Sequence, residues 1–403
     1  MSTALADHRA NQWRTPALTM LVILVSKSLY FESYGENSLL IPLFLIVLFS
    51  FPLTLRYQVN QVLILWAVAF CFLTIANANS QTSSLLVLIN RIAIALWLVM
   101  MIPFPTFARS FERIILFISA CSLLSLPIIA FNIHSPLPSF IAIDQRPLRN
   151  FFLFGVSESF VNYSVFRNSG PWWEPGAFQV FVNISALFSI LLARMTTKKY
   201  LLYLVVIAST QSTTGILVFF LLSILHFSTL SNHRNNTMSK VLFLFLTPAS
   251  VMLALPLIMD KFNLESSSVV SFLSRLYDVQ VSYNLFMEHP WFGYGFGSQI
   301  QIAIPYAQQL LGEFICSSSA KPTGADGITM LIAQCGIFSF LFLLPFLWPK
   351  YLRHFSYPQR LIAAISLFLL FNTENLSFTL IFIVLIFYGI LRHPDISAMT
   401  EKP

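Results

Sequence analysis

The segment FRNSGPWWEPGAFQVF combines residue types that could bind an anion and move a proton. It carries Arg167 and, seven residues later, Glu174, on either side of a turn rich in Gly, Pro and Trp that leads into an apolar run. A carboxylate at the start of a helix, followed by a proline, is stabilised by the positive end of the helix dipole. The functional alternative makes Glu174 an acid/base group near a membrane interface, with Trp172 and Trp173 packed on a sugar or on the lipid boundary.

Arg275 is the second candidate, and it lies in an amphipathic stretch over 271–289. The planar guanidinium of arginine suits the bidentate binding of phosphate. An ordinary solvated arginine, or an ion pair with Asp278, explains the residue equally well. Tyr283 and His289 follow on the same stretch and are further candidates for substrate binding.

The glycine-rich run HPWFGYGFG superficially suggests a phosphate-binding loop. No strand is predicted before it, and no Lys-Ser or Lys-Thr pair follows it, which argues against nucleotide binding. A tight turn explains its glycines better.

Several ionisable residues fall within or beside apolar runs, namely Lys27, Arg91, Glu374 and Asp326. Charged groups inside a membrane are costly and are functional candidates by default. For Lys27 and Arg91, pairing with an acidic residue or snorkelling to the interface remains an open alternative. We count Arg91 and Asp326 among the substrate-binding candidates, whereas Glu374 falls at a predicted outer turn, which weakens any claim that it is buried.

Neither a metal site nor a disulfide framework is predicted. The sequence contains no HExxH or DxD motif and no clustered His and Asp set. The four cysteines, Cys71, Cys121, Cys316 and Cys335, lack the spacing of metal ligands. We therefore expect no metal and no other cofactor.

The composition places these residues in a membrane protein. Hydrophobic residues make up 57% of the 403 residues and charged residues only 10%, against about 25% charged residues in soluble domains. The excess apolar surface must face lipid, and its long unbroken runs predict helices, because barrel strands would alternate over roughly 10 residues. The net charge of +7 is explained by topology, so no nucleic-acid partner is expected.

About 20 apolar residues are needed to span a bilayer. Candidate spans fall at 16–31, 38–55, 61–80, 83–104, 111–133, 173–193, 199–211, 213–230, 240–258, 324–348, 361–374 and 376–391. The polar break STQSTTG separates span 199–211 from span 213–230, and NTEN separates 361–374 from 376–391. Exposed polar turns are not tolerated in mid-bilayer, so each pair is counted as two spans. The sequence therefore predicts an all-α polytopic protein with about 12 transmembrane helices.

The positive charges predict the orientation of these helices. With both termini in the cytoplasm, fifteen Lys and Arg residues lie on the cytoplasmic side and six on the other, as the positive-inside rule requires. Two long loops, 134–172 and 259–323, then lie outside the cytoplasm, and loops of this length are usually functional. Both contain amphipathic stretches that could form short surface helices, and 1–403 forms a single membrane domain.

Four motifs in one order carry a resemblance to a known family. RNSGPWWEPGAF, STQSTTGILVF, HPWFGYGFG and DGITMLIAQCGIFSFLFLL, spread over 150–390, resemble the O-antigen polymerase/ligase superfamily. More narrowly, they are similar to Wzy-type O-antigen and exopolysaccharide polymerases.

This resemblance implies a GT-C-like glycosyltransferase of lipopolysaccharide or related polysaccharide biosynthesis. It implies a multi-pass protein of the bacterial inner membrane whose active site faces the periplasm. The implied reaction joins oligosaccharide repeat units carried on undecaprenyl diphosphate, without metal or nucleotide sugar. The implied partners are these lipid-linked oligosaccharides, membrane lipid and a chain-length regulator protein. By the same resemblance, Arg167 and Arg275 would bind the lipid diphosphates and Glu174 would be the acid/base or orienting carboxylate.

Two other functions stay open. The related ligases carry a His-Asn-type motif where this sequence reads PTGADGITML, with Asp326 and no histidine. This difference favours a polymerase over a ligase, although His289 could be a displaced substitute. A lipid-linked oligosaccharide flippase or another transporter is the other alternative, but the internal repeat that is typical of transporters is not found.

Overall fold

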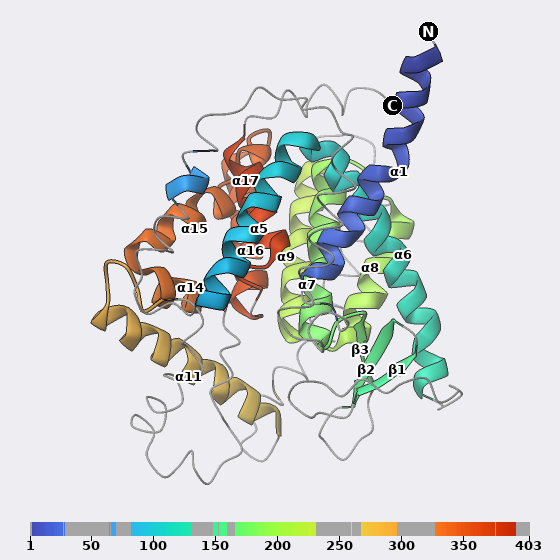
Figure 1. Cartoon of the computed structure of the whole chain (residues 1–403). Coiled ribbons are helices and arrows are strands. Elements are labelled where there is room, and N and C mark those ends of the chain that lie inside the picture. The colour runs from blue at the N-terminus through green and yellow to red at the C-terminus, as the bar shows by residue number, and fades with distance from the viewer. Residues whose placement is uncertain are drawn as a thin grey trace.

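The computed structural model describes residues 2–26, 28, 64, 66–69, 82–130, 148–151, 153–158, 166–230, 259, 267–295, 327–374 and 376–391. These residues form a bundle of helices with a small sheet at one end (Figure 1). The helices of the first half are α1 (Ser2–Val25), α5 (Thr82–Met101), α6 (Phe104–Ala130), α7 (Pro175–Leu191), α8 (Thr197–Thr210) and α9 (Thr213–Leu230). Those of the second half are α11 (Ser267–Glu288), α14 (Gly327–Cys335), η2 (Gly336–Ser339), α15 (Phe340–Leu347), η3 (Lys350–Leu352), α16 (Tyr357–Asn372) and α17 (Leu380–Ile390).

Both helix breaks that the polar motifs predict are confirmed. Helix α8 ends at Thr210, Gln211 adopts a left-handed conformation with φ 51°, and α9 begins at Thr213. Similarly, α16 ends at Asn372 and α17 begins at Leu380. The predicted spans 38–55 and 240–258, and most of 61–80, lie outside the described residues, so the count of 12 spans stays a prediction.

Several of the helices have the length and composition of membrane helices. Among the described residues, two segments, Phe104–Ile128 and Gly327–Leu352, are long and apolar enough to cross a membrane, and five shorter apolar helices accompany them. Along α14 to α15, the side chains of Ile337, Phe340 and Leu344 are exposed at a helical spacing. An apolar surface of this kind is what a lipid-facing helix presents.

Helices α7 and α17 form the centre of the bundle. Every residue of both helices is buried, as expected for helices that are apolar on all sides. Helix α7 packs against α6, α8, α9 and α16, and α17 packs against α5 and α15. The first turn of α7 therefore has a fixed position among its neighbours, and the candidate site is built around that turn.

The prediction of an all-α protein is wrong in one region. Three antiparallel strands, β1 (Leu148–Phe151), β2 (Phe154–Glu158) and β3 (Phe166–Gly170), occupy the described part of the predicted loop 134–172. Aromatic and β-branched residues in the run NFFLFGV favour strands, but the run is too short for its alternation to predict a strand. The sheet packs through β3 on α6, α7 and α8, which determines where Arg167 lies.

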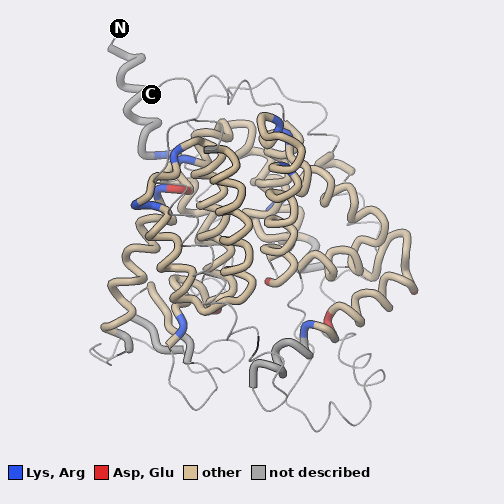
Figure 2. The backbone as a smooth tube through the Cα atoms, turned by 180° about the vertical axis from the view of Figure 1, so that it is seen from behind, with Lys and Arg blue, Asp and Glu red and all other residues tan. Residues whose placement is uncertain are grey.

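Charged residues gather at the two ends of the bundle. Figure 2 shows that most of the described Lys and Arg residues lie at the end near the N-terminus, and that fewer charges lie at the opposite end. We call the end near the N-terminus the basic end. Two contacts show which helix ends meet there. Lys350 Nζ donates to the Ile390 carbonyl at the end of α17 (2.5 Å), and Gln359 Nε2 near the start of α16 donates to Ser228 Oγ near the end of α9 (3.2 Å). Which end faces the cytoplasm stays a prediction from the charge bias.

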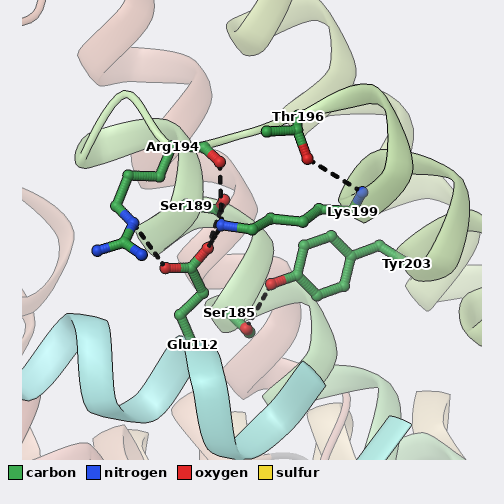
Figure 3. A network of polar contacts seen from close by, with 7 residues as sticks. All are labelled: Glu112, Ser185, Ser189, Arg194, Thr196, Lys199 and Tyr203. Carbon is green, nitrogen blue, oxygen red and sulfur yellow. Dashed lines mark hydrogen bonds and ion pairs between the residues drawn. The ribbon is translucent and has the colours of Figure 1, made fainter. Parts of the chain in front are cut away.

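A buried ion-pair network joins three helices at the basic end (Figure 3). Glu112 of α6 is 0% exposed. Its Oε1 accepts hydrogen bonds from Ser189 Oγ of α7 (2.9 Å) and from Lys199 Nζ of α8 (2.5 Å). Its Oε2 lies 3.5 Å from Arg194 Nε. A buried carboxylate requires such partners, so we assign this network a structural role.

Candidate active site

Arg275 and Glu374 form an ion pair across 99 residues of sequence. Arg275 Nη2 of α11 lies 3.5 Å from Glu374 Oε1 in the turn after α16. The Glu374 side chain is 5% exposed and that of Arg275 is 29% exposed. Glu374, and not Asp278, is thus the carboxylate that pairs with Arg275. The Arg275 side chain thus keeps some exposure while its carboxylate partner is covered.

The Glu374 carboxylate lies against the first turn of α7. A Cβ atom added at Gly176 would overlap its Oε1, so glycine is required there for the close approach. Glu174 is the N-cap residue of α7 and Pro175 is its first residue, which confirms the predicted helix start. The Glu174 side chain makes no cap hydrogen bond, and its stabilisation by the positive end of the helix dipole stays the structural alternative. Two carboxylates therefore flank the positive end of α7.

The start of α14 lies on the same turn. Asn372 Oδ1 accepts a hydrogen bond from Thr329 N (3.3 Å), and a Cβ added at Gly327 would meet the Glu374 carbonyl oxygen. The N-termini of α7 and α14 thus both approach Glu374. Helix N-termini carry partial positive charge, so this part of the molecule favours an anion.

Arg167 lies on the other side of α7, in β3. Its Nε donates to the carbonyl oxygen of Thr210 at the end of α8 (3.2 Å). The neighbouring Asn168 donates to Ser122 Oγ (3.0 Å) and Ser209 Oγ (3.1 Å). These contacts hold β3 against α6 and α8. Arg167 and Arg275 are therefore positioned by different elements, although both lie at the end of the bundle where α7 begins.

The two tryptophans differ in their surroundings. The Trp172 ring is 0% exposed, stacks on Phe181 with ring centroids 4.3 Å apart, and donates from Nε1 to the Ser26 carbonyl (3.2 Å). It is a core residue, and its predicted contact with a sugar conflicts with this burial. Trp173 is partly exposed, and within the described contacts its Nε1 has no hydrogen-bond partner. That nitrogen is itself buried, so the exposed part of Trp173 is ring surface, and its predicted contact with a sugar stays a prediction.

Arg91 contacts the turn that carries Glu374. Its Nη1, from α5, donates to the Phe378 carbonyl (3.3 Å). Phe378 itself has a left-handed conformation, with φ 64°. This contact gives Arg91, which the sequence predicts to lie within a span, a backbone partner in the turn that carries Glu374. Its role in substrate binding stays a prediction.

Tyr283 and His289 lie away from the Arg275–Glu374 pair. Tyr283 is exposed on the outer face of α11. His289 follows the end of that helix, fourteen residues after Arg275, which corresponds to about 21 Å along the axis. Its ring packs on Tyr294 (4.9 Å). A catalytic partnership of His289 with Arg275 is therefore not supported by this geometry.

The run after α11 is a tight turn, as predicted. Gly293 and Gly295 have φ of 72° and 101°, a region that favours glycine. Tyr294 N donates to the Ala333 carbonyl (2.8 Å) and Gly295 N to the Gln334 carbonyl (3.2 Å). These bonds fasten the turn to the end of α14.

Two predicted residues, Asp326 and Lys27, lie outside the described residues. Within the described ranges, no three or more His, Cys, Asp or Glu side chains come together to hold a metal ion.

Sequence reasoning left Glu374 out of the site, because its placement at an outer turn suggested exposure. The signal that could have found it was the acidic residue in NTEN between two apolar runs.

Comparison with known proteins bears on the segment that contains Arg275. Residues 200–317 match the family model described as O-antigen ligase, and this confirms the resemblance to the O-antigen polymerase/ligase superfamily. That family comprises membrane enzymes related to glycosyl transfer, which agrees with the apolar helices of the bundle. No curated protein matches the chain.

Proposed function

We propose that the protein polymerises undecaprenyl-diphosphate-linked oligosaccharide repeat units at the periplasmic face of the bacterial inner membrane. The product would be O-antigen or a related surface polysaccharide. The observation that carries this proposal is the partly exposed side chain of Arg275, held beside Glu374 at the start of α7. It lies in the segment that matches the O-antigen ligase model.

The chemistry of the reaction suits these residues. The bond from the anomeric carbon of the donor sugar to diphosphate breaks, and the acceptor hydroxyl forms the new glycosidic bond. Arginines stabilise the negative charge that develops on the departing lipid diphosphate. The acceptor hydroxyl loses its proton to a carboxylate as the bond forms, and Glu174 is our candidate for this base.

The outer face of α11 supports a location at the membrane surface. Leu276, Val279, Tyr283 and Met287 are all exposed, and their spacing of three and four residues puts them on one face of the helix. Exposed Trp291 follows in the turn after the helix. An apolar stripe with aromatic residues is typical of a helix lying in the bilayer interface, where the diphosphate of a lipid-linked substrate lies.

A ligase that transfers the glycan to the lipid A core is the second candidate function. The description of the matched family model favours it. A ligase would use the same diphosphate leaving group with a different acceptor, so Arg275 and Arg167 would serve either reaction.

Deletion of the gene, followed by gel analysis of the surface glycan, separates these functions. For a polymerase, we expect a single repeat unit on lipid A core, because export and ligation continue without chain growth. Polymer that accumulates on undecaprenyl diphosphate would identify a ligase. Single units retained inside the cell would identify a flippase and would contradict both glycosyltransferase functions.

Glu174→Gln tests the proposed base. Because general base catalysis contributes about 100-fold or more, we expect chain growth to slow by that order of magnitude in purified protein. The helix start is expected to survive, since Pro175 and the cap backbone are unchanged. Glu288→Gln, at an exposed glutamate of α11, is the matched control with normal activity. Full activity of Glu174→Gln would leave this carboxylate with a structural role only.

A further inference from the structure

The turn between α16 and α17 is fastened to several elements at once. Arg91 of α5 donates to the Phe378 carbonyl (3.3 Å). The backbone N–H of Ile381, just after the turn, donates to Ser26 Oγ at the end of α1 (3.0 Å). On the other side, Asn372 accepts from the third residue of α14. These contacts give the Glu374 backbone a defined position in the bundle.

From this position, the Glu374 side chain joins α7 and α11. Its carboxylate lies against Gly176, at the positive end of α7, and its Oε1 lies 3.5 Å from Arg275 Nη2. Within the described part of the chain, this is the polar contact that the Arg275 guanidinium makes. Arginine has five N–H donors, and a single contact to one terminal nitrogen leaves most of them to bind an anion.

The difference in burial between Glu374 and Arg275 indicates which of the two residues holds the other in place. The Glu374 side chain is 5% exposed and that of Arg275 is 29% exposed. The carboxylate therefore lies deeper in the protein than the arginine side chain. Long arginine side chains lose rotamer freedom when they are fixed, and this loss opposes binding. A carboxylate that fixes the guanidinium before the substrate arrives removes part of that cost from binding and reaction.

We infer that Glu374 is a positioning residue, whose buried carboxylate holds Arg275 against the first turn of α7 for contact with the lipid diphosphate. This inference rests on the proposed function of Arg275. It also accounts for Gly176, because any side chain there would displace the carboxylate.

Two variants disturb the contact in different ways. Glu374→Gln removes the negative charge at nearly constant volume. Gly176→Ala keeps both charges but puts a methyl group where the carboxylate lies. Both are compared with Glu288→Gln in full-length protein, with a defined undecaprenyl-diphosphate-linked repeat unit as substrate. The measurements are kcat, KM and the fraction of folded protein, and kcat is expressed per folded molecule.

We expect kcat to fall on the order of 100-fold in each single variant, because a misplacement of a catalytic group by about 1 Å can reduce the rate by that factor. KM should change less than threefold, because the positive charge of Arg275 remains. The double variant should be no slower than the slower single variant, since both changes act through one contact. A merely structural role would reduce the amount of folded protein and leave kcat unchanged.

Arg275→Ala separates failure of this inference from failure of the proposed function. If Arg275→Ala is inactive while Glu374→Gln and Gly176→Ala keep normal kcat, the positioning role of Glu374 is wrong and the function of Arg275 stands. If Arg275→Ala keeps full activity, the diphosphate-binding role fails and the positioning role fails with it. Multiplicative effects in the double variant would also contradict action through one contact.

Discussion

Arg275→Ala is expected to abolish glycan chain growth, while the protein still inserts and folds. Removal of one group that stabilises developing negative charge costs about 100-fold to 1,000-fold in kcat, and Arg275 carries a full charge. The structural cost should be small, because the guanidinium is partly exposed and its described polar contact is with Glu374 alone. The measurement is the length distribution of surface glycan in cells, normalised to the amount of protein in the membrane.

Three further variants sharpen this test. Arg275→Lys keeps a point charge but loses the planar fork, so an intermediate loss is expected. Arg353→Ala removes an exposed arginine from the loop before α16 and should have normal glycan. Arg167→Ala is also expected to abolish chain growth, but the bond from its Nε to Thr210 adds a structural component. Normal long-chain glycan in Arg275→Ala would remove the diphosphate-binding role.

Lys199→Met is expected to lower the free energy of unfolding by about 3 kcal/mol, since it leaves the buried charge of Glu112 without its closest partner. The converse variant, Glu112→Gln, should cost less. The side chains of Lys199 and Arg194 are 23% and 34% exposed, so both cations can regain water once the carboxylate is gone. This asymmetry follows from which partner is buried, and unfolding in detergent measures it.

The neighbouring Lys198→Met provides the control, because Lys198 is exposed and should change stability by less than about 0.5 kcal/mol. Turnover per folded molecule should stay normal in both Lys199→Met and Glu112→Gln. The network joins α6, α7 and α8 near the end of α7 (Figure 3), whereas Arg275 lies beside Glu374 at the start of α7. A loss of turnover without a loss of stability would show that this end takes part in the reaction.

Much of the helical architecture was predictable from local sequence. The apolar runs and the polar breaks located α8, α9, α16 and α17, because hydrophobicity and turn chemistry act over a few residues. The start of α7 at Pro175 was predicted in the same way. The sheet at 148–170 was missed, because strands of four or five residues carry too few alternations to be distinguished from a loop.

The candidate site was predictable only in part. Arg275 and Glu174 were selected by their chemistry, and both lie at the end of the bundle where α7 begins. Trp172 was selected by the same reasoning and is a core residue, since an aromatic side chain has the same sequence signature in a core as in a sugar site. His289 was selected for its chemistry, but the axis of α11 carries it away from the pair.

The sequence by itself determined that this chain is apolar and helical, where most of its described helices begin and end, and which charged residues stand out from their surroundings. These properties depend on neighbours within one or two turns. Only the tertiary structure decided which of the charged residues meet. Glu374 and Arg275 are 99 residues apart, and their contact depends on how α7, α11 and α16 pack, with Gly176 providing the space.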